Sequence, residues 1–239
     1  MQWYSGPEGD QRIWYEPEDI EQIAVEQLRV AKLSPTLDRP VTDLERLIEG
    51  HLRAELDLYA DLPDAVLGLT EFPVRGAPIV QIDRALTEAR DAEHATVAEI
   101  GRWRATLAHE ASHIFLHRYL FDPSMAPLAG GSSVPRPSEG GLMRCLHRDI
   151  SPEAADWRSV RRRPDWREVQ ANKAMAALLM PRRTFKRIVV REMRQLGLGL
   201  PPIAESDVQR LANVLAPIFS VSKQAVRIRL DSEGLLTRR

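Results

Sequence analysis

Two histidines and a glutamate are spaced so that they could bind and use a metal ion. They lie in His109-Glu110-Ala111-Ser112-His113, inside a run from Ile100 to His117 that lacks proline and has a glycine only near its start. Such a run predicts a helix. Residues four apart share one face of a helix, so both imidazoles can reach one zinc ion at about 2.0–2.1 Å. Glu110 could then take the proton of a metal-bound water. The alternative is a histidine pair on an ordinary helix.

A third metal ligand is expected on a second helix, because catalytic zinc usually has three protein ligands and one open position. The stretch from Asp165 to Met180 is rich in Ala, Leu and Met and is followed by Pro181, which predicts a buried helix. Glu168 on its packed side would need a partner or a metal. Asn172, four residues later, could hold a ligating histidine by a hydrogen bond. Alternatively, Glu168 lies in an exposed first turn and interacts favourably with the helix dipole.

In combination these segments resemble the ImmA/IrrE family of bacterial and phage metallopeptidases. The resemblance rests on Thr106-Leu-Ala-His-Glu-Ala-Ser-His113, on Glu168-Val-Gln-Ala-Asn172 and on the Ala-Leu-Leu-Met-Pro181 that follows, and it extends over roughly residues 20–237. It implies an α+β, mainly helical fold, with a zincin-like core, a small sheet and a C-terminal helix-turn-helix-like segment. It also implies one zinc ion per chain held by His109, His113 and Glu168, with Glu110 as the catalytic acid/base.

The match to the family differs at two positions. Ser112 replaces the usual glycine, and Ala174 stands where an aromatic residue is common, but neither change removes a ligand. Arg104 matches a basic residue that often precedes the motif. The resemblance implies a protein substrate, typically a helix-turn-helix repressor in phage, mobile-element or stress regulation. The alternative is a DNA- or protein-binding regulator with a silent or structural zinc site, although a structural zinc would not need the base Glu110.

Composition agrees with a cytoplasmic enzyme. The 239 residues have a formal net charge of −1 and a single cysteine, Cys145. The charge indicates neither nucleic-acid nor membrane binding, and the lone cysteine fits a reducing compartment. We do not expect Cys145 to bind zinc, since it has no second cysteine. No apolar run is long enough to span a bilayer, and the first residues do not resemble a signal peptide.

The chain is expected to have three parts. Residues 1–18 form a surface segment, 19–200 the metallopeptidase domain and 201–239 the helix-turn-helix-like segment. Residues 122–164 read as a flexible insertion rich in Gly, Pro and Ser; a lid over the site and a tolerated insertion are both open readings. A basic cluster within it could attract an acidic substrate, though a solvated loop is the simpler interpretation: Arg158, Arg161, Arg162 and Arg163.

Short strands are expected before the motif helix. Helices are predicted over Pro17–Lys32 and from Thr42 or Asp43 onward. Strands are predicted at 67–70, 72–74 and 77–83. In zincins a strand runs along the cleft, and we assign that role to Ile79, Val80, Gln81 and Ile82, whose free edge could hold an extended peptide. The alternative is an ordinary strand without a substrate role.

The remaining histidines and the C-terminal basic residues are not expected at the metal. His117 lies one turn beyond His113, too far along the helix to share its ion, while His51 is interpreted as structural and His94 as a surface residue. Residues 207–215 and 222–230 predict two helices, and the second carries Lys223, Arg227 and Arg229. This pair could read DNA. Because the helix is short and the chain is not basic, we expect it instead to pack beside the peptidase core.

Overall fold

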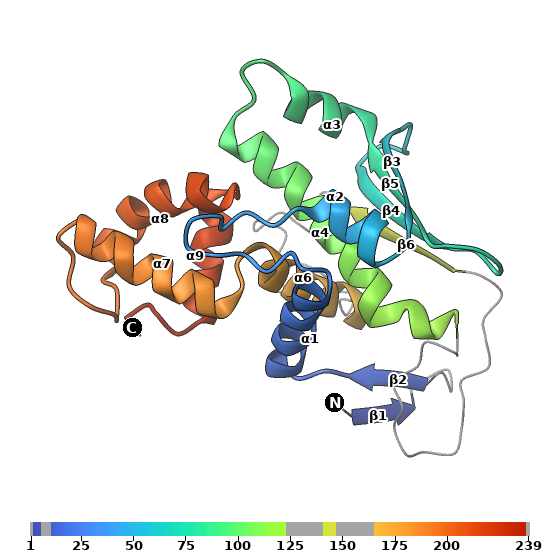
Figure 1. Cartoon of the computed structure of the whole chain (residues 1–239), viewed down its shortest axis with the longest axis horizontal. Helices are drawn as coiled ribbons and strands as arrows, with labels where there is room; N and C mark the ends of the chain where they lie inside the picture. The colour runs from blue at the N-terminus through green and yellow to red at the C-terminus, as the bar shows by residue number, and fades with distance from the viewer. Residues whose placement is uncertain (1, 6–10, 123–140, 147–164, 238–239) are drawn as a thin grey trace.

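The chain forms an α+β protein that is mainly helical, with a four-stranded sheet and a separate two-stranded hairpin, as seen in a computed structural model (Figure 1). The structure describes residues 2–5, 11–122, 141–146 and 165–237. The sheet packs on one side of the long helix α4, and the helices α1 and α6 lie on its other side (Figure 1). The predicted α+β, mainly helical class is therefore confirmed.

Helix α4 (Val97–His117) carries the histidine motif. Thr96 Oγ1 accepts a hydrogen bond from the Glu99 amide at 3.2 Å, and Glu99 Oε2 accepts one from the Thr96 amide at 2.7 Å. This reciprocal cap satisfies two amides that the helix cannot pair internally. The predicted helix is confirmed and begins three residues earlier than expected, because Thr96 is a better N-cap than any later residue. A 3-10 turn, η2 (Arg118–Leu120), follows it.

Helix α6 (Trp166–Leu179) carries the predicted third ligand. Asp165 caps it by accepting a hydrogen bond from the Arg167 amide at 3.0 Å, and Pro181 follows its end. The helix packs against α4 and against α1 (Pro17–Val30). Ala174 in the middle of this helix is fully buried. Its small side chain lets the helices approach one another closely.

The sheet consists of β3 (Glu55–Ala60), β4 (Val66–Phe72), β5 (Ile79–Asp83) and β6 (Gly141–Leu146), in the order β3-β5-β4-β6. β5 pairs in parallel with β3 and antiparallel with β4. The expectation that Ile79, Val80, Gln81 and Ile82 offer a free edge is wrong. Both sides of β5 are already hydrogen-bonded, so it cannot add a peptide strand.

Three shorter helices complete the N-terminal half of the fold. Asp43 caps α2 (Leu44–Arg46), as predicted, by accepting a hydrogen bond from the Arg46 amide at 3.0 Å. A π-helical turn, η1 (Leu47–His51), continues α2. Helix α3 (Arg84–Asp91) follows β5 directly and leads toward α4. These elements bury Leu44, Leu47, Ile48 and Leu86 in the main core.

The C-terminal helices pack on the rest of the molecule. They are α7 (Arg182–Gln195), α8 (Glu205–Phe219) and α9 (Lys223–Ser232). A Cβ on Gly101 of α4 would lie 2.8 Å from the Ser222 amide nitrogen, so the start of α9 touches α4 directly. Arg229 is buried and donates to the Met180 carbonyl at 3.0 Å. Packing beside the core, as expected for this segment, is therefore observed.

The N-terminal hairpin differs from the expected surface segment. It consists of β1 (Gln2–Ser5) and β2 (Gln11–Trp14), which pair antiparallel. Ile13 is fully buried and Tyr15 is 3% exposed. Both belong to a small apolar cluster with Leu116 and Tyr119 at the end of α4. These two side chains cover the end of that helix, which is why they lie inside although their segment is at the chain terminus.

Most of the predicted 122–164 insertion falls on residues 123–140 and 147–164, outside the described residues, as do Arg158, Arg161, Arg162 and Arg163. The part between them, Gly141–Leu146, is strand β6 and pairs with β4. In the part of the chain that the structure describes, no helix combines the length and the apolar character needed to cross a membrane.

Candidate metal centre

Helices α4 and α6 bring His109, His113 and Glu168 together. The two Nε2 atoms of the histidines lie 3.0 Å apart. Glu168 Oε2 lies 3.0 Å from His109 Nε2, and Glu168 Oε1 lies 3.6 Å from His113 Nε2. The three groups offer ligand atoms that are all within 4.8 Å of one another. We refer to these three residues as the metal cluster.

The spacing and the hydrogen bonding of the metal cluster fit a bound cation. Tetrahedral bonds of about 2.0–2.1 Å would place ligand atoms about 3.3 Å apart, close to the observed separations. His109 Nδ1 lies 3.2 Å from Asn172 Oδ1. Because that oxygen only accepts, Nδ1 carries the ring proton and Nε2 keeps its lone pair for the cluster. Ligand atoms that converge in this way need a positive charge between them, either a shared proton or a metal ion, so these residues could hold a metal ion.

Burial and mutual charge set the protonation of the cluster. Both histidines are fully buried, and the Glu168 side chain is 21% exposed. Burial favours a raised pKa for Glu168, but hydrogen bonds and charge from His109 and His113 outweigh it and hold the pKa well below its usual value. Burial lowers the pKa of His113. Burial acts in the same direction on His109, yet Glu168, which accepts a hydrogen bond from the protonated ring, and nearby carboxylate charge raise its pKa. Glu168 is therefore ionised, as a metal ligand must be.

Glu110 is fully buried beside the metal cluster. Thr70 Oγ1 on β4 donates a hydrogen bond to Glu110 Oε2 at 2.5 Å. A Cβ on Gly68, also on β4, would lie 2.8 Å from Glu110 Oε1. The strand thus approaches Glu110 so closely that a side chain at position 68 would force Thr106 or Glu110 to shift, and Thr70 holds one oxygen of the carboxylate. Neither residue was expected at the site from the sequence, although a glycine inside a strand is itself a signal of close backbone approach.

His117 lies behind the metal cluster and is not part of it. Its Nδ1 is 3.1 Å from His113 Nδ1, and its Nε2 is 3.1 Å from Gln170 Oε1. Burial lowers the pKa of His117 well below its usual value, which keeps the ring neutral. His117 was not expected to be a ligand, and its contact with His113 was not predicted. The signal was present, because His117 follows His113 by four residues on one helix face.

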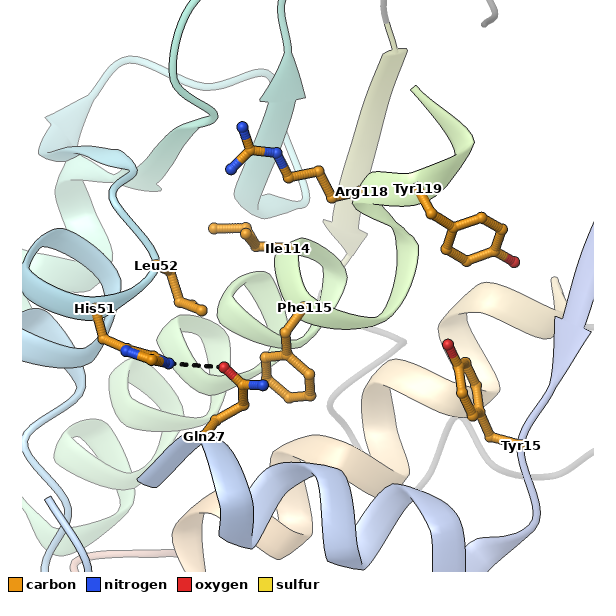
Figure 2. Close-up of a pocket in the computed structure, with 8 residues that line it drawn as sticks. All are labelled: Tyr15, Gln27, His51, Leu52, Ile114, Phe115, Arg118 and Tyr119. Atoms are coloured by element: carbon orange, nitrogen blue, oxygen red, sulfur yellow. Dashed lines mark hydrogen bonds between the residues drawn. The ribbon is translucent and has the colours of Figure 1, made fainter. Parts of the chain in front are cut away.

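Other candidates lie elsewhere. The buried Arg104 donates to the Thr42 carbonyl at 2.9 Å, and burial lowers its pKa to about 10 despite the charge of Asp43. It therefore secures the start of α2. His94 is exposed. His51 hydrogen-bonds to Gln27 at 2.8 Å on the wall of a separate pocket of about 290 Å³, shown in Figure 2, which none of the metal-cluster residues lines.

The C-terminal basic residues are largely used inside the molecule. Arg229 pairs with Glu21 at 2.7 Å and is buried. Arg227 forms an ion pair with Glu205 of α8. Of the three basic side chains considered for DNA contact, two are therefore held by acidic residues of the same chain.

No family model, curated protein or solved structure matches this chain. The residues of the site therefore define its possible chemistry. These are two imidazoles and a carboxylate able to hold a metal ion, with a second buried carboxylate next to them in the sequence.

Proposed function

We propose that this protein is a zinc-dependent metallo-endopeptidase. The observation that carries the proposal is the convergence of His109, His113 and Glu168, with Glu110 adjacent to the first ligand on the same helix. Two histidines and a glutamate are a ligand set of catalytic zinc sites, which keep one position open, whereas structural zinc sites are usually closed and rich in cysteine. The donor set therefore favours catalysis over a structural role.

The residues of the chain then divide the chemistry among them. Zinc, when bound, supplies a Lewis acid that acidifies water and polarises a peptide carbonyl. Glu110 takes a proton from the attacking water and delivers it to the leaving amine. Thr70 holds one carboxylate oxygen of Glu110, which limits the rotation of the base. Asn172 orients His109 through its Nδ1.

The resemblance to the ImmA/IrrE family supports a peptidase and suggests its substrate. We interpret α4, the sheet and α6 as a zincin-like core, and α8 with α9 as the helix-turn-helix-like segment of that family. The substrate is then a helix-turn-helix repressor in phage, mobile-element or stress regulation, and cleavage takes place in the cytoplasm. Direct nucleic-acid binding is not part of this function.

The variant Glu110→Gln tests the proposal, because it removes the base and keeps the size of the side chain. Wild-type protein loaded with zinc is expected to cleave one of the helix-turn-helix repressors encoded near its gene. Glu110→Gln should lose at least ~10²-fold in cleavage rate, a typical contribution of a general base, while its zinc content is unchanged. Glu88→Gln is the matched control, since Glu88 is exposed on α3. Cleavage products are followed by mass spectrometry.

The opposite results would favour the regulator. If Glu110→Gln cleaves the repressor as fast as the wild type, the mechanism is wrong. If the wild type binds a repressor tightly and leaves it intact, the protein is a binding regulator with a silent or structural zinc site.

A further inference from the structure

A series of hydrogen bonds links His113 through His117 and Gln170 to Ile13 of the N-terminal hairpin, and each bond has a defined donor and acceptor. We propose that His117 and Gln170 are positioning residues that transmit the fixed polarity of the Ile13 carbonyl to His113, so that strand β2 is a structural part of the metal centre. This inference rests on the proposed metal site and concerns how neighbouring residues orient its ligand His113.

The direction of these hydrogen bonds is set by the Ile13 carbonyl, which can only accept. Gln170 Nε2 lies 3.0 Å from the Ile13 carbonyl oxygen, and a carbonyl oxygen only accepts hydrogen bonds. The amide of Gln170 must therefore present its NH2 group to β2. Ile13 is held in place by a second bond, in which its amide donates to Tyr119 Oη at 2.9 Å. Both polar groups of this buried residue are thus bonded to side chains that follow or belong to the helices of the metal centre.

The orientation of Gln170 fixes the tautomer of His117. With its NH2 directed at Ile13, Gln170 turns Oε1 toward His117 Nε2 at 3.1 Å. That oxygen accepts, so Nε2 of His117 carries the ring proton and Nδ1 keeps a lone pair. Gln170 is 2% exposed and His117 is fully buried, so water does not compete for these groups. Trp166 packs edge-on against the His117 ring with centroids 5.4 Å apart and limits its rotation.

The tautomer of His117 in turn fixes that of His113. The two Nδ1 atoms lie 3.1 Å apart, and one proton must lie between them. Since His117 Nδ1 is the acceptor, His113 Nδ1 is the donor, and His113 Nε2 presents its lone pair to the metal cluster. His109 reaches the same state through Asn172 alone. The series that orients His113 involves more residues than the single contact of His109, but it has the same result. In both rings Nδ1 carries the proton and Nε2 is available to a metal ion.

Zinc affinity tests the positioning role. The variants His117→Leu and Gln170→Leu remove one link each, and His94→Leu and Gln195→Leu are matched controls at exposed positions. Competition with a chromophoric chelator measures the zinc dissociation constant, and circular dichroism reports folding. His117→Leu and Gln170→Leu should each bind zinc roughly 10–100-fold more weakly than the wild type, the usual effect of losing the hydrogen-bond partner of a ligand. His117→Gln, whose amide oxygen can accept from His113, should recover affinity to within about 10-fold of wild type.

A tautomer measurement separates positioning from simple packing. Nitrogen NMR of the histidine-labelled, zinc-free wild type should show His117 protonated at Nε2, and Gln170→Leu should reduce that preference. If His117→Leu fails to fold, zinc affinity can still be measured on Gln170→Leu, and the tautomer can still be measured on the wild type.

Wild-type affinity in both leucine variants, or His117 protonated at Nδ1 in the wild type, would overturn the inference. Failure of the proposed function looks different. If the proposed function fails, the wild type binds no zinc. The tautomer of His117 still shows whether the series of hydrogen bonds from Ile13 to His113 has the proposed direction.

Discussion

Two regions of this protein bury charged side chains, and they do so in opposite ways. In the metal cluster, two imidazoles and a carboxylate face one another, with no lysine or arginine among the three members. In the C-terminal region, a group that we call the α9 ion-pair group joins acids to bases directly. Its members are Glu21, Arg182, Lys186, Arg229 and Glu233.

The difference teaches how to separate a candidate site from a structural network. Arg229 pairs with Glu21 at 2.7 Å and with Glu233 at 3.1 Å, and the charges of the α9 ion-pair group are thereby compensated within the chain. Such a group holds helices in place and needs nothing further. The metal cluster has no lysine or arginine among its members, so its carboxylate is balanced by a proton on an imidazole or by a bound metal ion. Burial of charge alone does not indicate function, whereas buried ligand atoms that converge on one point mark a candidate metal site.

The largest expected effect is on the metal cluster. Wild-type protein should carry about one zinc ion per chain, while His113→Ala and Glu168→Ala should each lose it. Excess zinc at about 1,000 times the dissociation constant should stabilise the wild type by ~4 kcal/mol and leave both variants unchanged. Elemental analysis and thermal unfolding measure these effects, and His94→Ala is the control. Metal retained at the same affinity in both variants would refute the ligand assignment.

A smaller effect is expected from the α9 ion-pair group. Arg229→Met leaves the buried Glu21 and Glu233 without one of their partners, which should cost about 3–5 kcal/mol in the free energy of unfolding. Arg227→Met on the same helix breaks the more exposed pair with Glu205 and should cost no more than ~1 kcal/mol. Urea unfolding measures both. Zinc content should stay unchanged in both variants as long as they are folded. Equal costs at the two positions would show that burial of the α9 ion-pair group has no energetic consequence.

The smallest effect concerns DNA. Alanine at both Lys223 and Arg227 should change zinc content and unfolding little, because both side chains are exposed. Wild type should bind duplex DNA only weakly, within the non-specific range of roughly 10⁻⁴–10⁻⁶ M at physiological salt. Fluorescence anisotropy at several salt concentrations checks this. Tight, sequence-specific binding that disappears in the double variant would instead make α9 a DNA reader.

The sequence could predict the parts of the site that depend on local spacing. His109 and His113 share a face because they are four residues apart, and the same rule places Glu168 and Asn172 together on α6. The rule also held for His113 and His117, although we used it there only to exclude a ligand. The end of α6 followed from Pro181, whose breaking effect is local, whereas the cap at Thr96 was not recognised and α4 begins three residues earlier than expected.

The parts that failed depend on contacts between distant segments. A run such as Ile79–Asp83 indicates a strand but does not identify its neighbours, so its position between β3 and β4 could not be predicted. The approach of Gly68 and Thr70 to Glu110 depends on how β4 lies against α4. Ile13 and Tyr15 were assigned to the surface because a four-residue strand gives too short a pattern to reveal a buried face.

The ion pair between Arg229 and Glu21 also has a consequence for the order in which the protein matures. Its partners are separated by 208 residues, whereas His109 and Glu168 are separated by 59. Chains are synthesised from the N-terminus and fold as segments emerge from the ribosome. All three residues of the metal cluster can therefore be outside the ribosome while α9 is still inside it, and Glu21 meets its partner only when synthesis is almost finished. In a nascent chain the metal cluster can therefore come together before α1 is joined to α9 by the pair of Glu21 and Arg229.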